Sequence, residues 1–415
     1  MKCSEFVFLL FALSAITQPQ LQTQPLVKTG VDVLIDQDFS PLKGKRVGLI
    51  TNPTGVTGGL ESTIDIFARS KEFTLAALFA PEHGIRGEAP AGGAIASTTD
   101  FATGVAIYSL YGRTKKPTAE MLKGIDVLVY DIQDIGIRSY TFISTMAKAM
   151  EAAAENNIEF VVLDRPDPLT GERVEGNVIE PKFKSFVGMF PIPYVYGMTC
   201  GEIATMINDE GWLGEGKKCK LTVIRMQGWK RSMTWEETGL RWVPPSPHIP
   251  TPAAALFCAA TGILGELNTL SVGVGYTLPF QLVGAPWING SLLSEKMNAL
   301  ELPGIYFRPV TYTPFYAAMK GKQVNGVELY LTDPKNANLV NTQLYLMETI
   351  NAMYPAKDIF AGAESSSVEM FDKVMGTDQV RRELAAGIPA ANIIARWQKE
   401  VETFMPLRKK YLLYE

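Results

Sequence analysis

The segment 80–88, APEHGIRGE, holds two glutamates, an arginine and one of the two histidines in this 415-residue chain. The residues before it, 74–80, are apolar and typical of a buried strand. Glu82 therefore follows a buried strand and precedes a glycine, a position that could hold its carboxyl group partly out of water. A carboxyl group held in this way is suited to general acid–base catalysis near neutral pH.

Polar and ionisable side chains also follow the other predicted strands of the N-terminal half. Ligands of an open parallel sheet bind outside the carboxyl ends of its strands, so these side chains are expected to share one cleft with Glu82. They are Asn52 after 46–51, Asp131, Gln133 and Asp134 at the end of 126–133, Arg138 and Tyr140 beyond them, and Asp164 near the end of 159–165.

Two carboxyl groups on either side of one bond can hydrolyse a glycoside. They stand about 5 Å apart in retaining enzymes and about 6.5–9.5 Å apart in inverting ones. Glu82 could pair with Glu88 on the same loop, or with Asp134. Structural roles stay open as alternatives, with Glu82 as a loop acceptor and with Asp134 and Asp164 as a helix cap and a turn brace.

Several other chemistries lack their motifs. The chain has no G-x-G-x-x-G after its first strand, no P-loop motif and no G-x-S-x-G, so a dinucleotide, a nucleoside triphosphate or a serine nucleophile is not expected. His83 and His248 lack metal-ligand spacing, and His83 equally fits a structural hydrogen-bonding role. We expect no cofactor and no metal, and the net charge of −4 without a basic run predicts no nucleic-acid partner.

The elements that position these residues alternate between strand-like and helix-like segments from about 30 to 230, which predicts a doubly wound α/β domain with a mainly parallel sheet. A proline-rich segment, 241–252, interrupts the pattern. We predict one domain over 26–252 and a smaller α+β domain over 253–415. The strands are expected at 46–51, 74–80, 105–111, 126–133, 159–165 and 221–226, with short strand-like pieces at 305–314 and 326–333. The helices are expected at 59–70, 118–124, 143–155, 200–209, 253–266, 291–299, 337–353, 377–385 and 388–402.

Residues 1–20 combine a weakly positive start with an apolar stretch at 6–16 and a polar region after it. This pattern predicts a cleaved signal peptide and an exported, periplasmic or secreted protein, with a buried N-terminal helix as the alternative. No later apolar stretch has the length of a transmembrane helix. Three cysteines remain after cleavage, without the spacing of a disulfide framework or a zinc site, and they leave open one bridge between Cys200 and Cys219.

Six stretches of the chain resemble one bacterial family, the exo-acting β-N-acetylmuramidases. They are GLITNPTGV (48–56), LFAPEHGIRGE (78–88), VYDIQDIGIRSYTFISTM (129–146), VVLDRPDPLTG with VEGNVIEP (161–181), YVYGMTCGE (194–202) and WVPPSPHIPT (242–251). The resemblance implies a Rossmann-like domain followed by a smaller one. It also implies release of N-acetylmuramic acid from the non-reducing end of peptidoglycan fragments.

The same resemblance implies roles for individual residues. Glu82 would be the leading catalytic carboxylate, and His83, Asp131, Gln133, Asp134 and Arg138 would line its cleft. Muramic acid carries a lactyl carboxylate, which Arg86 or Arg138 could bind through two parallel hydrogen bonds. Tyr140, Tyr196 or Trp242 could stack on the sugar, and we also place His248 at the substrate.

One segment departs from the family pattern. Relatives carry a sequence close to S-E-G-R-G-T followed by P-F-E, whereas residues 271–281 here read SVGVGYTLPFQ. Val272, Val274 and Gln281 thus stand where relatives have charged residues. Two alternatives to a glycosidase follow from the residues, a sugar-binding protein without turnover and a metal-dependent hydrolase that uses His83, His248 and Asp131.

Overall fold

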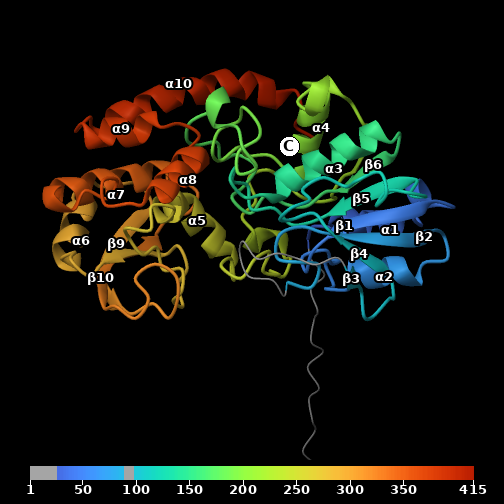
Figure 1. Ribbon diagram of the computed structural model, residues 1–415, viewed down its shortest axis with the longest axis horizontal. Helices are drawn as coiled ribbons and strands as arrows, with labels where there is room; N and C mark the ends of the chain where they lie inside the picture. Colours follow the sequence, from blue (N-terminus) through green and yellow to red (C-terminus); the bar gives the residue numbers. More distant parts are fainter. Residues whose placement is uncertain (1–25, 88–97) are drawn as a thin grey trace, which may run out of the picture.

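The computed structural model describes residues 26–87 and 98–415, which form two parts side by side (Figure 1). The larger part is built on a seven-stranded sheet in the order β3-β4-β2-β1-β5-β6-β7. All neighbours pair in parallel except β3 and β4. The strands are β1 (Arg46–Thr51), β2 (Thr74–Ala80), β3 (Thr98–Thr99), β4 (Ala106–Ser109), β5 (Val127–Asp131), β6 (Glu159–Leu163) and β7 (Lys220–Ile224).

Helices cover both faces of this sheet because alternate residues of its central strands point to opposite sides. Val47 and Leu49 of β1 pack with helices α1 (Gly30–Asp36) and α2 (Thr63–Arg69). Ile50 packs on the other face with α3 (Phe142–Glu155) and α4 (Cys200–Asp209). The predicted doubly wound α/β fold is therefore confirmed.

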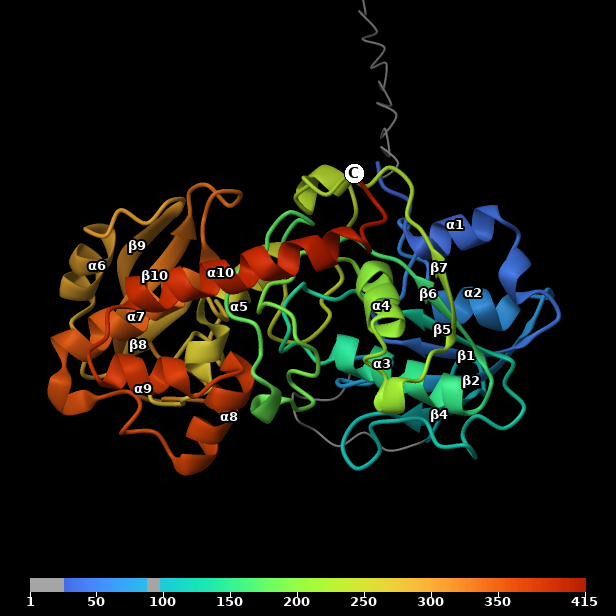
Figure 2. The ribbon, with the colours of Figure 1, turned by 90° about the horizontal axis from the view of Figure 1, so that it is seen from above.

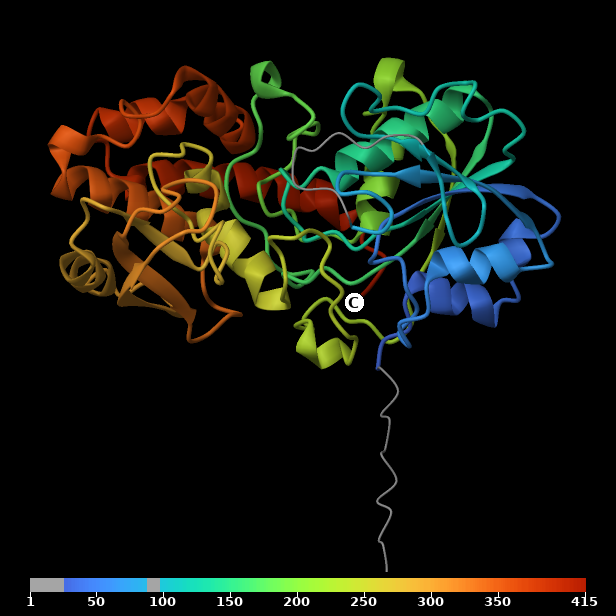
Figure 3. The ribbon, with the colours of Figure 1, turned by 60° about the horizontal axis from the view of Figure 1, so that its bottom comes forward.

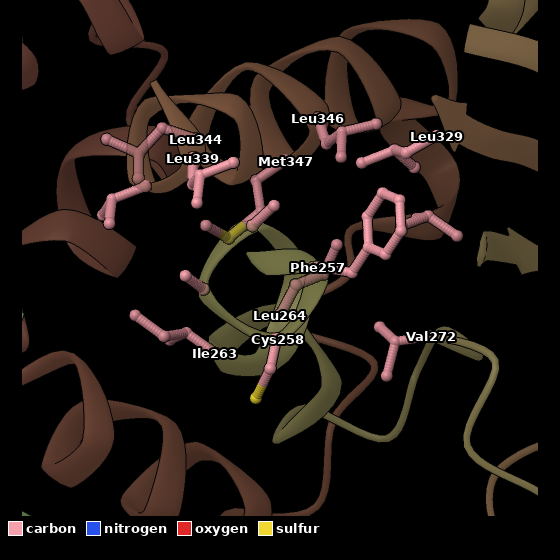
Figure 4. Close-up of a cluster of buried hydrophobic side chains, with 14 of the residues drawn as sticks. Phe257, Cys258, Ile263, Leu264, Val272, Leu329, Leu339, Leu344, Leu346 and Met347 are labelled. Atoms are coloured by element: carbon pink, nitrogen blue, oxygen red, sulfur yellow. The ribbon is translucent and has the colours of Figure 1, made fainter. Parts of the chain in front are cut away.

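The smaller part carries a three-stranded antiparallel sheet in the order β8-β10-β9. Helices α5 and α7 pack against each other beside it, and Figure 4 shows Phe257 and Leu264 of α5 facing Leu344 and Met347 of α7. The elements are α5 (Pro252–Gly265), β8 (Leu282–Ala285), α6 (Gly290–Asn298), β9 (Ile305–Tyr312), β10 (Val324–Leu331), α7 (Leu339–Met353), α8 (Ser365–Met375) and α9 (Gln379–Ala385).

Helix α10 (Ala390–Lys409) runs from the smaller part back across the larger one (Figure 2). Near its end, Phe404 joins the apolar core of α3 and α4. Arg408 donates from Nη2 to the carbonyl oxygens of Gly197, at 2.7 Å, and Gly171. The last residues of the chain therefore pack against the first part, and the proposed division into 26–252 and 253–415 stays a prediction.

Most predicted elements match the observed ones, and β1 and β2 have the predicted bounds. The helix predicted at 118–124 is wrong, because this segment forms only turns. Helices α1 (Gly30–Asp36) and α8 and strands β3 and β8 were not predicted from the sequence.

The predicted signal peptide at 1–20 lies outside the described residues. Among the helices that the structure describes, none has the length and apolarity needed to cross a bilayer. Cys200, Cys219 and Cys258 are buried free thiols, so the bridge between Cys200 and Cys219 that the sequence left open does not form.

Candidate active site

A cavity of about 190 Å³ lies between the two parts, at the carboxyl end of β2. It contains both histidines of the chain and two carboxyl groups that come from different parts of the molecule. Its ionisable and polar lining includes Glu82, His83, Ser139, Tyr140 and Thr141 from the larger part, Ser246 and His248 from the proline-rich segment, and Cys258 and Glu266 from the smaller part.

Glu82 enters this cavity on a tight turn that follows β2. The turn is closed by a 3.2 Å hydrogen bond from the Gly84 amide to the Pro81 carbonyl. His83 adopts a left-handed backbone with φ of 72°, which is costly for a residue that has a Cβ atom. Such strained residues cluster at functional sites, where the surrounding structure holds them in place.

Two hydroxyl groups face the Glu82 carboxyl group. Thr141, the residue before α3, donates from Oγ1 to Glu82 Oε2 at 2.8 Å. Burial raises the pKa of Tyr111, and the charge of Glu82 and a hydrogen bond to it raise that pKa further. Glu82 is therefore held as a hydrogen-bond acceptor at the edge of the cavity.

Glu266 also lines the cavity, directly after the last residue of α5. Burial raises the pKa of its carboxyl group to about 7. No hydrogen bond or ion pair to this carboxyl group comes from any residue in the described ranges. The sequence analysis predicted a helix over 253–266 but missed Glu266 as a site residue. One feature of the sequence could have indicated it: helix α5 has no charged residue, and Glu266 is the first one after it.

His248 lies at the rim of the cavity beside a tyrosine of the smaller part. Its Nε2 atom is 3.1 Å from the hydroxyl oxygen of Tyr316, and the two rings stack with centroids 6.0 Å apart. Burial, followed by the charge of His83, lowers the pKa of His248. The two histidines are thus close enough to interact, as their shared cavity requires.

Three residues that were expected in the cleft are instead buried at the edge of the sheet. Asp131 Oδ1 accepts a 2.6 Å hydrogen bond from Arg165 Nε, and its Oδ2 accepts one of 2.6 Å from Thr63. Gln133 donates to backbone carbonyls, and Asn52 accepts hydrogen bonds within its own turn. These hydrogen bonds all come from or go to other protein groups, as is usual for buried polar side chains.

Asp134, Asp164 and Tyr196 are also buried away from the cavity, which corrects the expectation that they line it. The hydroxyl group of Tyr196 donates to Asp134 Oδ2 at 2.5 Å. Burial raises the pKa of Asp134 and of Asp164 to about 6. Asp164 binds the start of α4, where it accepts a 2.8 Å hydrogen bond from the Gly201 amide.

The two arginines expected to bind a carboxylate have protein partners. Arg138 is buried and donates to the carbonyl oxygens of Asn177, Ile192 and Met375 at 2.7–2.8 Å. Arg86 pairs with Asp100 through Nη2 at 3.0 Å. Neither lines the cavity, so the structure places both outside the expected position.

Tyr140 is the one predicted stacking residue that lines the cavity. Trp242 instead packs edge-on against Trp235, and its indole nitrogen donates to the Ile249 carbonyl at 3.0 Å. Glu88, the other predicted partner of Glu82, lies outside the described residues.

The altered segment 271–281 reaches the cavity at one residue, Phe280. Val272 is buried in the core of the smaller part, and Val274 packs partly against it. Gln281 donates to the Leu329 carbonyl at 3.2 Å. The residues that replace charged groups therefore pack inside the smaller part rather than in the cavity.

A metal site made of His83, His248 and Asp131 is not assembled, because the Asp131 carboxylate binds Arg165 away from both histidines. Across 26–87 and 98–415, no group of three or more histidine, cysteine or acidic side chains could hold a metal ion.

Comparison with known proteins gives consistent matches over almost the whole chain. Two models of the exo-β-N-acetylmuramidase NamZ family match consecutive regions. The N-terminal model matches residues 47–253, and the C-terminal model matches residues 256–414. The chain is 45% identical over 405 residues to peptidoglycan β-N-acetylmuramidase NamZ of Bacillus subtilis (strain 168), which covers 97% of this chain and 95% of that protein.

Two crystal structures of DUF1343 family proteins from Bacteroides fragilis NCTC 9343 share the fold. One has a TM-score of 0.90 at 50% identity, and the other has a TM-score of 0.76 at 32% identity. Each match covers 94% of this chain and 99% of the solved chain.

Proposed function

This chain belongs to the exo-β-N-acetylmuramidase NamZ family and is thereby a glycosidase, and we propose that it releases N-acetylmuramic acid from the non-reducing end of peptidoglycan fragments. The observation that carries the proposal is the position of Glu82. A strained turn at the end of β2 holds its carboxyl group in the cavity between the two parts, with both histidines beside it. The relative from Bacillus subtilis is a peptidoglycan β-N-acetylmuramidase by name.

The cavity offers the groups that an exo-acting glycosidase of this kind needs. Glu82 is the catalytic carboxylate in our proposal, oriented by Thr141. Tyr140 supplies an aromatic side chain to the lining, which suits contact with the apolar face of a sugar ring. His83 and His248 are the basic side chains in the described part of the lining, so we assign them to the lactyl carboxylate of the substrate.

The substrate is a cell-wall glycan outside the cytoplasm, so the proposal includes export directed by residues 1–20. Expression of the full chain followed by N-terminal sequencing of the released protein tests this part. A mature protein that begins near residue 20 supports export, whereas recovery of the intact chain from the cytoplasm contradicts it.

The central test replaces Glu82 by glutamine, which keeps the shape of the side chain but removes its acid–base function. We expect the wild-type protein to release the chromophore from 4-nitrophenyl β-N-acetylmuramide and the Glu82→Gln variant to be slower by roughly 100- to 10,000-fold. Glu295→Gln, a change at an exposed acid of α6, is the matched control and should retain full activity.

Two results would contradict the proposal. Equal activity of Glu82→Gln and wild type would remove Glu82 from the chemistry. Binding of a muropeptide without any turnover by the wild type would favour the sugar-binding protein instead. The exo mode is checked on longer glycan fragments, where single N-acetylmuramic acid units should appear before any larger product.

A further inference from the structure

Glu266 is the second carboxyl group of the cavity, and it comes from a different part of the molecule than Glu82. It directly follows α5, the helix that lies where the two parts meet (Figure 3). Glu82 comes from the large sheet, whereas Glu266 comes from the smaller part, so the two carboxyl groups meet only when both parts are in place. Glycosidases need two such groups on either side of the scissile bond.

We propose that Glu266 is the catalytic acid of this cleft and protonates the leaving oxygen of the glycosidic bond, an inference that rests on the glycosidase function proposed above. The assignment replaces Glu88 and Asp134 as partners of Glu82. Asp134 is buried beside Tyr196 and does not line the cavity, so it has no contact with a substrate bound there.

The surroundings of Glu266 favour a protonated carboxyl group. Cys258, Gly262 and Phe280 line the same cavity, and they contribute no positive charge that would stabilise a carboxylate. The end of α5 adds the negative end of a helix dipole, which disfavours a second negative charge there. Burial raises the pKa of Glu266 to about 7, which also favours the protonated form near neutral pH.

Glu82 has the complementary surroundings. The hydroxyl group of Thr141 donates to it, and Tyr111 lies within hydrogen-bonding reach. Two carboxyl groups that share one site in different environments are the pattern of an acid and its partner base. We therefore assign the role of proton donor to Glu266 and the role of base to Glu82.

The reaction is balanced with these two groups and water. The bond between C1 of the muramic acid and the glycosidic oxygen breaks, and its electron pair goes to that oxygen, which takes the proton of Glu266. Over the whole hydrolysis, one water adds to C1 and its proton goes to Glu82. Proton exchange with solvent then returns Glu266 to the acid form and Glu82 to the carboxylate.

A structural role for Glu266 makes a different prediction. A carboxyl group that stabilises a fold does so through hydrogen bonds or ion pairs. Glu266 has none within the part of the chain that the structure describes. An acid that must contact a substrate, by contrast, stays unpaired until the substrate binds.

The test compares two substrates that differ in how much they need an acid. The disaccharide of N-acetylmuramic acid and N-acetylglucosamine has a poor leaving group, whereas 2,4-dinitrophenyl β-N-acetylmuramide has one that leaves without protonation. We expect Glu266→Gln to lose about 100-fold or more on the disaccharide and less than about fivefold on the aryl glycoside. The fall of kcat above about pH 7 in the wild type should also disappear.

Several controls separate the outcomes. Glu82→Gln should lose activity on both substrates, and Glu266→Asp should keep the fall of kcat at high pH because it keeps a carboxyl group. Equal losses of Glu266→Gln on both substrates, or no loss on either, would overturn the acid role. A wild-type protein that cleaves neither substrate would instead reject the proposed function itself.

Discussion

At the scale of single residues, burial and hydrogen bonding separate the acids that face the cavity from those that hold the fold. Asp131 ends strand β5 at the same edge of the sheet, yet its two oxygens accept hydrogen bonds from Arg165 and Thr63. Glu82 keeps a place in the cavity because the turn after β2 projects it there. In that turn His83 adopts a left-handed backbone, which is strained for a residue with a Cβ atom. The strained residue is thus the neighbour of the proposed catalytic carboxylate.

His83→Asn tests whether this strain is retained for function. Asparagine tolerates the left-handed region better than histidine or most other residues, so we expect stability to stay equal or to rise by about 0.5–1 kcal/mol. Activity on the chromogenic muramic acid glycoside should fall at least about tenfold, because the imidazole is lost from the cavity. Urea unfolding and steady-state kinetics measure the two effects.

Leu60→Asn provides the matched control, since Leu60 is exposed, has φ of 70° and does not line the cavity. It should gain similar stability and leave activity unchanged. Full activity of His83→Asn would show that the imidazole has no part in the reaction.

At the scale of elements, the sequence predicted what short-range patterns determine. The apolar runs of β1 and β2 are bounded by clear turns, and their ends were placed correctly. The segment 118–124 has helix-forming residues, but a helix this short has little stability of its own, and Leu122 reaches the core from a run of turns. Glu266 could not be assigned for a related reason, because only the packing of the two parts brings it to the cavity that Glu82 also lines.

The same limit explains Asp164, which was predicted to bind substrate and instead binds the start of α4. It accepts hydrogen bonds from the Thr199 hydroxyl at 2.7 Å, the Gly201 amide at 2.8 Å and the Tyr414 hydroxyl at 2.6 Å. Two of these partners belong to the start of a helix and the third to the chain terminus. A strand end rich in polar residues therefore does not tell a binding site from a buried cap.

Asp164→Ala tests the structural role. Four hydrogen bonds to a buried carboxyl group are lost, the fourth from the Arg165 amide, so the free energy of unfolding should fall by roughly 2–4 kcal/mol while KM changes little. Urea unfolding and substrate kinetics give both values. Asp209→Ala, an exposed change at the other end of α4, should be neutral or slightly stabilising. A large rise in KM without loss of stability would restore the substrate role of Asp164.

At the scale of the whole molecule, contacts between distant segments hold the two walls of the cavity in register. Arg138 binds the carbonyl oxygens of Asn177 in the larger part and Met375 at the end of α8 in the smaller part. A cation is favoured there because Met375 ends a helix. This link and helix α10 both join the smaller part to the larger one. The positions of Glu82 and Glu266 relative to each other therefore depend on contacts throughout the chain.

Buried acids make the stability of the whole molecule depend on pH. Burial raises the pKa of Asp167 from 3.8 to about 8, and the pKa of Asp134 and of Asp164 to about 6. Each acid binds its proton more tightly in the folded state than in the unfolded state. Stability is therefore highest below the unfolded pKa and falls as the pH rises through the folded values, over a window from about pH 4 to 8.

Asp167→Asn isolates the largest of these effects, because an amide cannot ionise and can still accept the hydrogen bond from the Leu169 amide. We expect the variant to match the wild type at pH 5 and to have a higher thermal midpoint at pH 8. Asp333→Asn is the control, since hydrogen bonds from Asn336 lower the pKa of this exposed acid and keep it ionised across the window. Two results would show that burial of Asp167 does not control this dependence. One is a thermal midpoint of the wild type that rises from pH 5 to 8. The other is an equal change of midpoint with pH in Asp167→Asn and the wild type.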